Sequence, residues 1–133
     1  MLRWFVSYLA VFLAMGALDA VWLTLAGERF YRANIGELLA PGFRLAPAAA
    51  FYLFYVFGLV VLAVRPGDEG QSIGRAMAYG AVYGLCAYAT YDLTNQATMK
   101  VWPTVVTVVD MAWGMTLSAC AAAVGAWVAG KLA

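Results

Sequence analysis

The sequence contains no histidine, and only 11% of its residues are charged. Without histidine the protein lacks the commonest general base and the usual ligand of zinc and haem iron. It also lacks the serine–histidine pair of ordinary nucleophilic enzymes. The two cysteines, Cys86 and Cys120, each lie inside an apolar run, which is typical of small core residues more than of a disulfide or a metal site. We therefore predict no cofactor and no metal site; a divalent cation held by the carboxylate oxygens of Asp19, Asp92 and Asp110 stays an open alternative that no spacing motif supports.

Apolar residues make up 65% of the chain, far more than a soluble domain of 133 residues could bury. The sequence therefore predicts an integral membrane protein whose residues 1–133 form a single domain, with membrane lipid as its first partner. The formal net charge is +1, and no basic patch is present, which argues against binding to nucleic acid.

Four apolar runs are long enough to cross the roughly 30 Å hydrocarbon core of a membrane. They cover Trp4–Ala26, Leu45–Val64, a stretch that starts after Arg75 and reaches Asn95, and Thr104–Gly130. The first run carries Asp19 and no clean cleavage site, which favours a retained helix over a signal peptide. We predict an all-α, four-transmembrane-helix bundle.

The connections between the runs differ in character. Gly27–Arg44 is polar with scattered apolar residues, and we expect it to form an interfacial segment between the first and second helices. Arg65–Ser72 is predicted to be an exposed turn. In the third run Gly80 and Gly84 form a small-residue ridge suited to close helix packing, and the fourth run has a similar ridge at Gly114, Ser118, Ala121 and Gly125.

Three aspartates lie within the apolar runs. Asp19 is near the end of the first run, Asp92 near the end of the third, and Asp110 in the first third of the fourth. Because successive spans alternate in direction, all three acids are expected in the same half of the bilayer. Charged groups at this depth are costly, so they indicate a functional site. We predict that the three carboxyl groups meet in one pocket and are its catalytic residues.

Aromatic and amide side chains accompany these acids. Tyr88, Tyr91, Asp92 and Asn95 share one face of a helix at positions i, i+3, i+4 and i+7. The spacing Asp-x-x-Trp occurs in the first and the last run, and an indole one turn from an acid can donate its N–H and shield the carboxyl group. The second run places tyrosines in the same half of the bilayer. The predicted substrate-binding residues are Tyr88, Tyr91, Asn95, Trp22, Trp113, Tyr52 and Tyr55.

Other interpretations of these residues stay open. The aspartates could form an interhelical hydrogen-bond network that only holds the bundle together, and the tyrosines could belong to an interfacial aromatic belt. Trp102 is predicted to be such a belt or lipid-facing residue. Arg29 and Arg32 are more typical of lipid head-group anchors than of catalytic groups.

The chain resembles a family of small bacterial membrane proteins known as domain of unknown function 2177. Four motifs carry the resemblance: Asp19-Ala-Val-Trp22, Phe51-Tyr52-Leu-Phe-Tyr55, Asp110-Met-Ala-Trp113-Gly114 and, most specifically, the stretch Tyr88–Asn95. The resemblance covers essentially the whole chain. It implies a bacterial inner-membrane protein of four helices and no particular activity.

The residues favour an intramembrane enzyme that acts on a lipid or isoprenoid, such as an isomerase, a cyclase or a hydratase. A carboxyl group in an apolar pocket favours its neutral form and can act as a general acid; Asp92 is the candidate, with Asp110 and Asp19 as partners. Aromatic faces would stabilise a developing cation, and Asn95 would orient the group being protonated.

Two other functions are consistent with the sequence. One is a small proton- or cation-coupled transporter, which requires a homo-oligomer because four helices rarely enclose a pathway. The other is a structural or partner subunit of a membrane complex. Lysine and arginine are divided four against four between the two sides, so charge does not decide the orientation. We expect both termini in the cytoplasm, because some connector arginines could be occupied by the site acids or by lipid phosphate.

Overall fold

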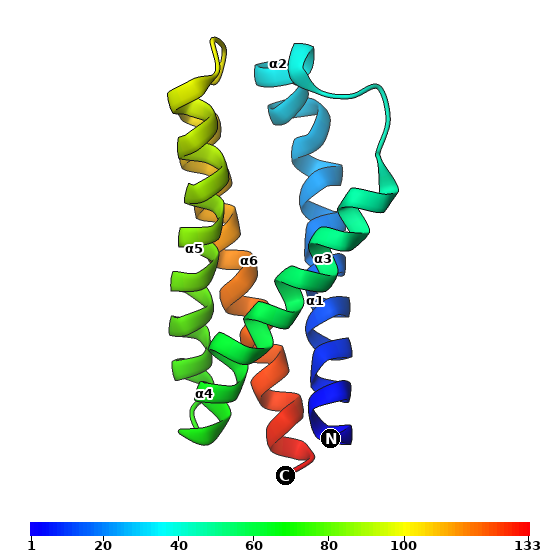
Figure 1. Ribbon diagram of the computed structural model, residues 1–133, viewed down its shortest axis with the longest axis vertical. Helices are drawn as coiled ribbons and strands as arrows, with labels where there is room; N and C mark the ends of the chain where they lie inside the picture. The colour runs from blue at the N-terminus through cyan, green and yellow to red at the C-terminus, as the bar shows by residue number, and fades with distance from the viewer.

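The computed structural model describes all 133 residues as helices joined by short connections, without a β-strand (Figure 1). The long elements are α1 (Leu2–Ala26), α3 (Leu45–Leu59), α5 (Ile73–Thr98) and α6 (Thr104–Lys131). α3 continues through a π-helical turn, η3 (Val60–Val64), into the short helix α4 (Arg65–Glu69). The predicted all-helical class is confirmed, and the helices match the predicted runs closely.

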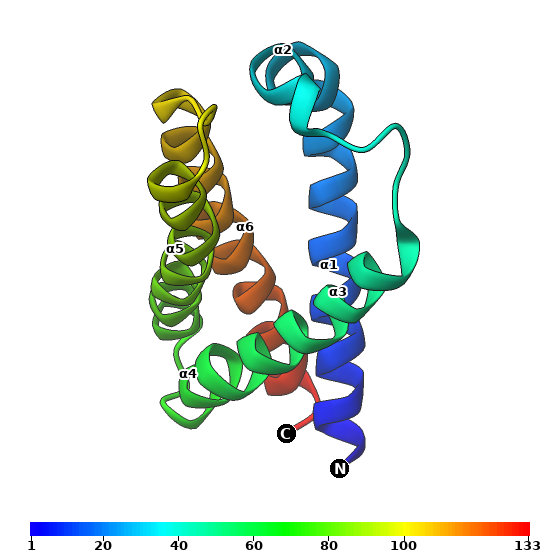
Figure 2. The ribbon, with the colours of Figure 1, turned by 45° about the horizontal axis from the view of Figure 1, so that its top comes forward.

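The segment between α1 and α3 is helical over most of its length. α1 passes directly into a π-helical turn, η1 (Gly27–Tyr31), followed by α2 (Arg32–Ile35) and a 3-10 turn, η2 (Gly36–Leu38). Figure 2 shows this part of the chain bending over one end of the bundle before an extended strip leads down to α3. That end, at the top of Figure 1, is called the upper end below.

The prediction of an exposed turn at Arg65–Ser72 is wrong for its first part, which forms α4. In a regular α-helix the ring of Pro66 would clash with the carbonyl group four residues earlier, at Leu62. That carbonyl lies within the wider turn η3, which lets the helix continue past the proline. The chain turns only at Gly70–Ser72, where the Ser72 hydroxyl accepts a hydrogen bond from the Arg75 backbone N–H at 3.0 Å and caps α5.

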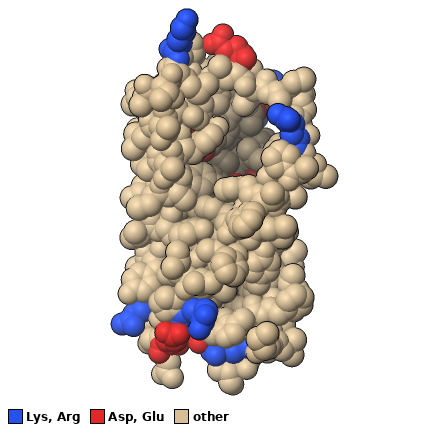
Figure 3. Space-filling view, in the orientation of Figure 1, with Lys and Arg blue, Asp and Glu red and all other residues tan.

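Three helical stretches are long and apolar enough to cross a membrane: Leu2–Leu38, Leu45–Glu69 and Thr104–Lys131. α5 is as long as the others, but its glycines, tyrosines and late polar residues lower its hydropathy. The prediction of four spans is therefore confirmed only in part. Figure 3 shows charged side chains gathered at the two ends of the molecule, with a wide uncharged belt between them.

α5 and α6 make the most extensive helix contact in the fold; they lie side by side in the upper part of the bundle and separate toward the lower end, where α4 lies beside α5 (Figure 2). Small residues allow this approach. A Cβ atom at Gly80 would lie 2.7 Å from the Ser118 carbonyl oxygen and 2.8 Å from the Ala122 Cβ atom. A Cβ atom at Gly84 would lie 2.2 Å from the Gly114 carbonyl oxygen and 2.5 Å from the Ser118 hydroxyl oxygen. The small-residue ridges thus pack as the sequence predicted.

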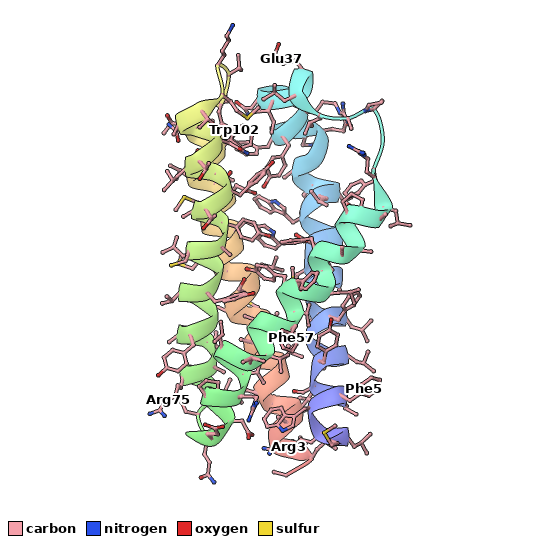
Figure 4. The ribbon with its side chains drawn as sticks, viewed as in Figure 1. Arg3, Phe5, Glu37, Phe57, Arg75 and Trp102 are labelled. Carbon is pink, nitrogen blue, oxygen red and sulfur yellow. The ribbon has the colours of Figure 1, made fainter.

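The lower half of the bundle is closed by apolar side chains and by contacts at its end. Its core contains, among others, Val11, Met15, Leu59, Val64, Leu117, Ala121 and Ala122. Below this core Arg3, labelled in Figure 4, forms an ion pair with Asp68 and donates from Nε to the Ala129 carbonyl oxygen at 2.9 Å. α1, α4 and α6 are joined here, and both termini lie at this end (Figure 1).

We expect Gly80→Ala to lower the free energy of unfolding by about 1–3 kcal/mol, because the new methyl group meets backbone of α6 that cannot move aside locally. Gly16→Ala is the matched control. Gly16 also lies within a helix, and a Cβ atom there meets nothing within 4 Å, so helix propensity should leave stability unchanged or slightly higher. Thermal unfolding in detergent, followed by circular dichroism, compares the two. Equal unfolding temperatures would contradict the packing described.

Candidate functional site

A pocket of about 460 Å³ lies in the upper half of the bundle, between α1 with its helical extension, α5 and α6. Figure 3 shows a hollow on this face, above the place where α3 crosses the bundle, with acidic atoms visible inside it. The side chains of Asp19, Asp92 and Asp110 all line the pocket. The structure therefore brings the three aspartates together from three helices. No group of three metal-ligating side chains is close enough to hold a metal ion.

Asp92 is the most unusual residue of the pocket. Its side chain is fully buried, and neither carboxyl oxygen meets a hydrogen-bond donor. It lies beside the carboxyl group of Asp110, which lines the same pocket. Two ionised carboxylates in such contact repel each other, whereas one shared proton turns the repulsion into a hydrogen bond. This pair is called the Asp92–Asp110 dyad below.

Asp110 is held from the opposite side by a chain of donors. The Tyr31 hydroxyl donates to its Oδ1 atom at 2.7 Å, and the Trp22 indole Nε1 donates to the Tyr31 hydroxyl at 3.0 Å. Tyr31 is the last residue of η1, and π-helical turns of this kind occur often at functional sites. The turn thus presents a phenol from the α1 extension to an acid on α6.

Asp19 has its own donors. The Trp113 indole Nε1 donates to its Oδ1 atom at 3.0 Å, and the Tyr52 hydroxyl of α3 donates to its other oxygen. The sequence predicted that each indole would serve the acid one turn away on its own helix. The structure corrects this pairing: Trp113 of α6 serves Asp19 of α1, and Trp22 of α1 serves Asp110 of α6 through Tyr31.

The two indoles stack face to face where these hydrogen bonds cross. The ring centroids of Trp22 and Trp113 are 4.6 Å apart, with 9° between the planes. The Trp113 N–H points across the interface to Asp19 of α1, whereas the Trp22 N–H donates to Tyr31 on the helical extension of its own helix. The stack therefore packs the α1 side of the site against the α6 side, next to both donors.

A second hollow, of about 310 Å³, opens between α3 and α5 and is almost entirely apolar. Its lining consists of Phe51, Tyr55, Ala87, Tyr88, Tyr91 and Asp110. It shares Tyr88, Tyr91 and Asp110 with the pocket, so the two spaces meet at the acid of α6. This hollow is called the α3–α5 groove below.

The remaining predicted residues are distributed around these two spaces. Tyr88 packs its ring against Gly114, where a side chain would collide with it, and Tyr91 is largely exposed and meets Trp102 edge-on. Tyr55 lines only the groove, and its hydroxyl is hydrogen-bonded to Ser118 at 2.6 Å. Asn95 is half-buried and lines neither space. Tyr52 contacts Asp19 without lining the pocket.

Sequence reasoning missed Tyr31, and it placed Trp102 in a lipid-facing belt. Both side chains line the pocket. Trp102 also donates from Nε1 to the Thr107 hydroxyl at 3.1 Å, which turns its ring inward. Arg32 lies at the pocket too, paired with Glu28 at 2.9 Å. No signal pointed to Tyr31, because nothing in residues 27–31 predicts that α1 continues through a π-helical turn.

We expect Tyr31→Phe to destabilise the fold by about 1–3 kcal/mol, because it removes the acceptor of the Trp22 N–H and a donor to Asp110 in a poorly hydrated site. The control is Tyr79→Phe, since the Tyr79 side chain is exposed and makes no hydrogen bond within the protein. Thermal unfolding measures the stability of both variants, and a double-mutant cycle with Asp110→Asn measures the coupling between Tyr31 and Asp110. Equal effects of the two phenylalanine variants would contradict the chain of donors.

Comparison with known proteins gives one result. No curated protein and no solved structure matches the chain. A family model described as a predicted membrane protein matches residues 4–127, which is nearly the whole sequence. The chain therefore belongs to the domain of unknown function 2177 family of membrane proteins, as its Tyr-Asp-Leu-Thr-Asn stretch predicted.

Proposed function

We propose that this protein is an intramembrane enzyme that binds a lipid or isoprenoid in the acidic pocket and catalyses an acid–base reaction on it. One observation carries the proposal: Asp92 is fully buried and both of its oxygens lack a donor. A buried carboxyl group whose oxygens accept no hydrogen bond is costly, and a purely structural network would leave none at its centre. The cost is understandable if the group must be available to a substrate.

In this proposal Asp92 is the general acid and Asp110 its partner. The proton to be transferred resides on Asp92, while the Tyr31 hydroxyl donates to Asp110 at 2.7 Å and holds that carboxyl group in place. Transfer of the proton to a carbon–carbon double bond forms a C–H bond, breaks the π bond and leaves a positive charge on the substrate. Loss of a proton from a neighbouring carbon to the dyad restores the acid and completes an isomerisation. The reaction requires no co-reactant.

The pocket walls would stabilise the intermediate positive charge. Trp22 and Trp113 supply indole faces, and Tyr88 and Tyr91 supply phenol rings on the opposite side. Aromatic faces attract cations by about 0.5–2 kcal/mol each, more where water is excluded. The α3–α5 groove offers an apolar route from the side of the bundle to Asp110, which suits a substrate that arrives from the membrane.

A transporter is less well supported by the same structure. The pocket is confined to the upper half, and the lower half is filled by buried apolar side chains such as Val11, Met15 and Leu117. No acidic side chain continues the series of aspartates through this core. An ion or solute taken up in the pocket therefore has no polar path to the other end.

The proposal includes four membrane crossings, with α5 as the third. α3 and α6 both run from the upper to the lower end of the molecule (Figure 1). If both cross the membrane in the same direction, the chain between them must return, and α5 is the only long element there. Both termini then lie on the same side of the membrane, which we propose is the cytoplasmic side of a bacterial inner membrane.

Asp92→Asn should abolish turnover without unfolding the protein. The new amide can donate a hydrogen bond to Asp110, but it has no proton to transfer. Protein in nanodiscs is incubated in D₂O with an extract of bacterial lipids, and mass spectrometry detects any lipid that gains deuterium. We expect incorporation with the wild type and a loss of about 100-fold or more in the variant.

The control is Glu37→Gln, because Glu37 is an exposed acid at the same end of the molecule that does not line the pocket (Figure 4). It should leave incorporation unchanged. Unchanged incorporation in Asp92→Asn, or none with the wild type, would contradict the proposed function. An Asp92→Asn protein that no longer folds would favour a structural role for the acid.

The topology is tested through native Cys86, an exposed residue in the middle of α5. In a Cys120→Ala background, Cys86 should resist a membrane-impermeant maleimide from both sides and react only after detergent is added. In a cysteine-free background, Lys100→Cys and Glu69→Cys should be labelled from opposite sides. Labelling of Cys86 in intact membranes would contradict a spanning α5.

A further inference from the structure

The charge of the pocket is almost entirely negative. Among its lining residues are Asp19, Glu28, Asp92 and Asp110, and the only basic side chain is Arg32. Arg32 is already paired with Glu28, with 2.9 Å between Nε and Oε1. The inner part of the pocket thus holds three carboxyl groups and no cation that could balance them. An anionic ligand such as a phosphate would meet repulsion there and no available cation.

The rings around these acids complement the same sign of charge. Seven aromatic side chains line the pocket: Trp22, Tyr31, Phe43, Tyr88, Tyr91, Trp102 and Trp113. Aromatic faces carry negative electrostatic potential and attract cations. Acids and rings together thus favour positive charge at the inner end of the pocket, where Asp92 still lacks a donor.

The α3–α5 groove adds a place for an apolar chain. It is lined by Phe51, Tyr55 and Ala87 and ends at Asp110, where it joins the pocket. Its only charged lining residue is that acid. A molecule that fills both spaces would have one apolar chain directed sideways and one reactive end between the acids.

We propose that the site selects a single-chain amphiphile whose reactive end is uncharged on entry and positively charged at the acids, and that it excludes lipids with a phosphate head group. This inference rests on the proposed function, because protonation by Asp92 creates the positive charge. A stable ammonium amphiphile then resembles the charged intermediate and binds more tightly than its uncharged counterpart.

Three probes with the same chain test the selection: dodecyltrimethylammonium, dodecanol and dodecyl phosphate. Each radiolabelled probe, below its micellar concentration, is titrated against the protein in phosphatidylcholine nanodiscs, and binding to empty nanodiscs is subtracted. We expect the ammonium probe to bind at least tenfold more tightly than dodecanol, and dodecyl phosphate to show no saturable binding.

Two variants assign the effect to the acids. Asp19→Asn and Asp110→Asn keep acceptors for Trp113 and Tyr31, and each should weaken ammonium binding about tenfold while changing dodecanol binding little. Glu37→Gln controls for general attraction of cations to this end of the molecule and should have no effect. Equal weakening in all three variants would overturn the assignment to the pocket.

The outcomes separate this inference from the proposed function. Binding of dodecyl phosphate as tight as that of the ammonium probe overturns the charge selection, as does equal affinity for all three probes; deuterium incorporation could still be observed in either case. Selective ammonium binding without any deuterium incorporation would support the charge selection, and it would leave the proposed chemistry without support.

Discussion

The upper half of this protein depends on one constraint: carboxyl groups within an apolar bundle must receive hydrogen bonds from the protein itself. Two of the three aspartates satisfy it through donors on other elements. Asp19 of α1 receives bonds from Trp113 of α6 and from Tyr52 of α3, and Asp110 of α6 receives one from Tyr31 of the α1 extension. Each of these bonds links an acid on one helical element to a donor on another. The bonds therefore hold the acids in place and also hold the helices in position relative to one another. Asp92 alone is left with an acid as its neighbour, and this exception marks the centre of the site.

The two halves of the bundle are packed differently, and the difference follows from side-chain size. Glycine and alanine along α5 and α6 allow backbone contact, and the apolar core with the Arg3–Asp68 ion pair closes the lower end. Above that core, aromatic side chains hold the helices further apart and line the pocket. A rigid lower half thus positions the upper one. Such a division suits a site in which small displacements of the acids would change their mutual distance and hence their proton sharing.

Much of this arrangement was predictable from the sequence, for identifiable reasons. Pro47 and Pro103 mark the starts of α3 and α6, and a continuous apolar run determines each helix length. The depth of each aspartate in its run, together with alternating helix direction, placed the three acids in one half of the molecule. Which indole serves which acid depends on the crossing of α1 and α6, and no local spacing encodes it. The role of Tyr31 depends on a π-helical turn, for which the residues Gly27–Tyr31 give no periodic signal.

That turn limits how the chain can change in length. From Asp19 to Tyr31 the backbone is helical without interruption, so inserting or deleting one residue would rotate every later side chain by about 100° around the axis. The phenol would then face away from Asp110, and no loop lies between them to absorb the shift. The irregular stretch 39–44 carries no helical phase, so a change in length there would displace only nearby side chains such as Phe43 at the pocket. Variation in length should therefore be better tolerated after residue 38 than before residue 31.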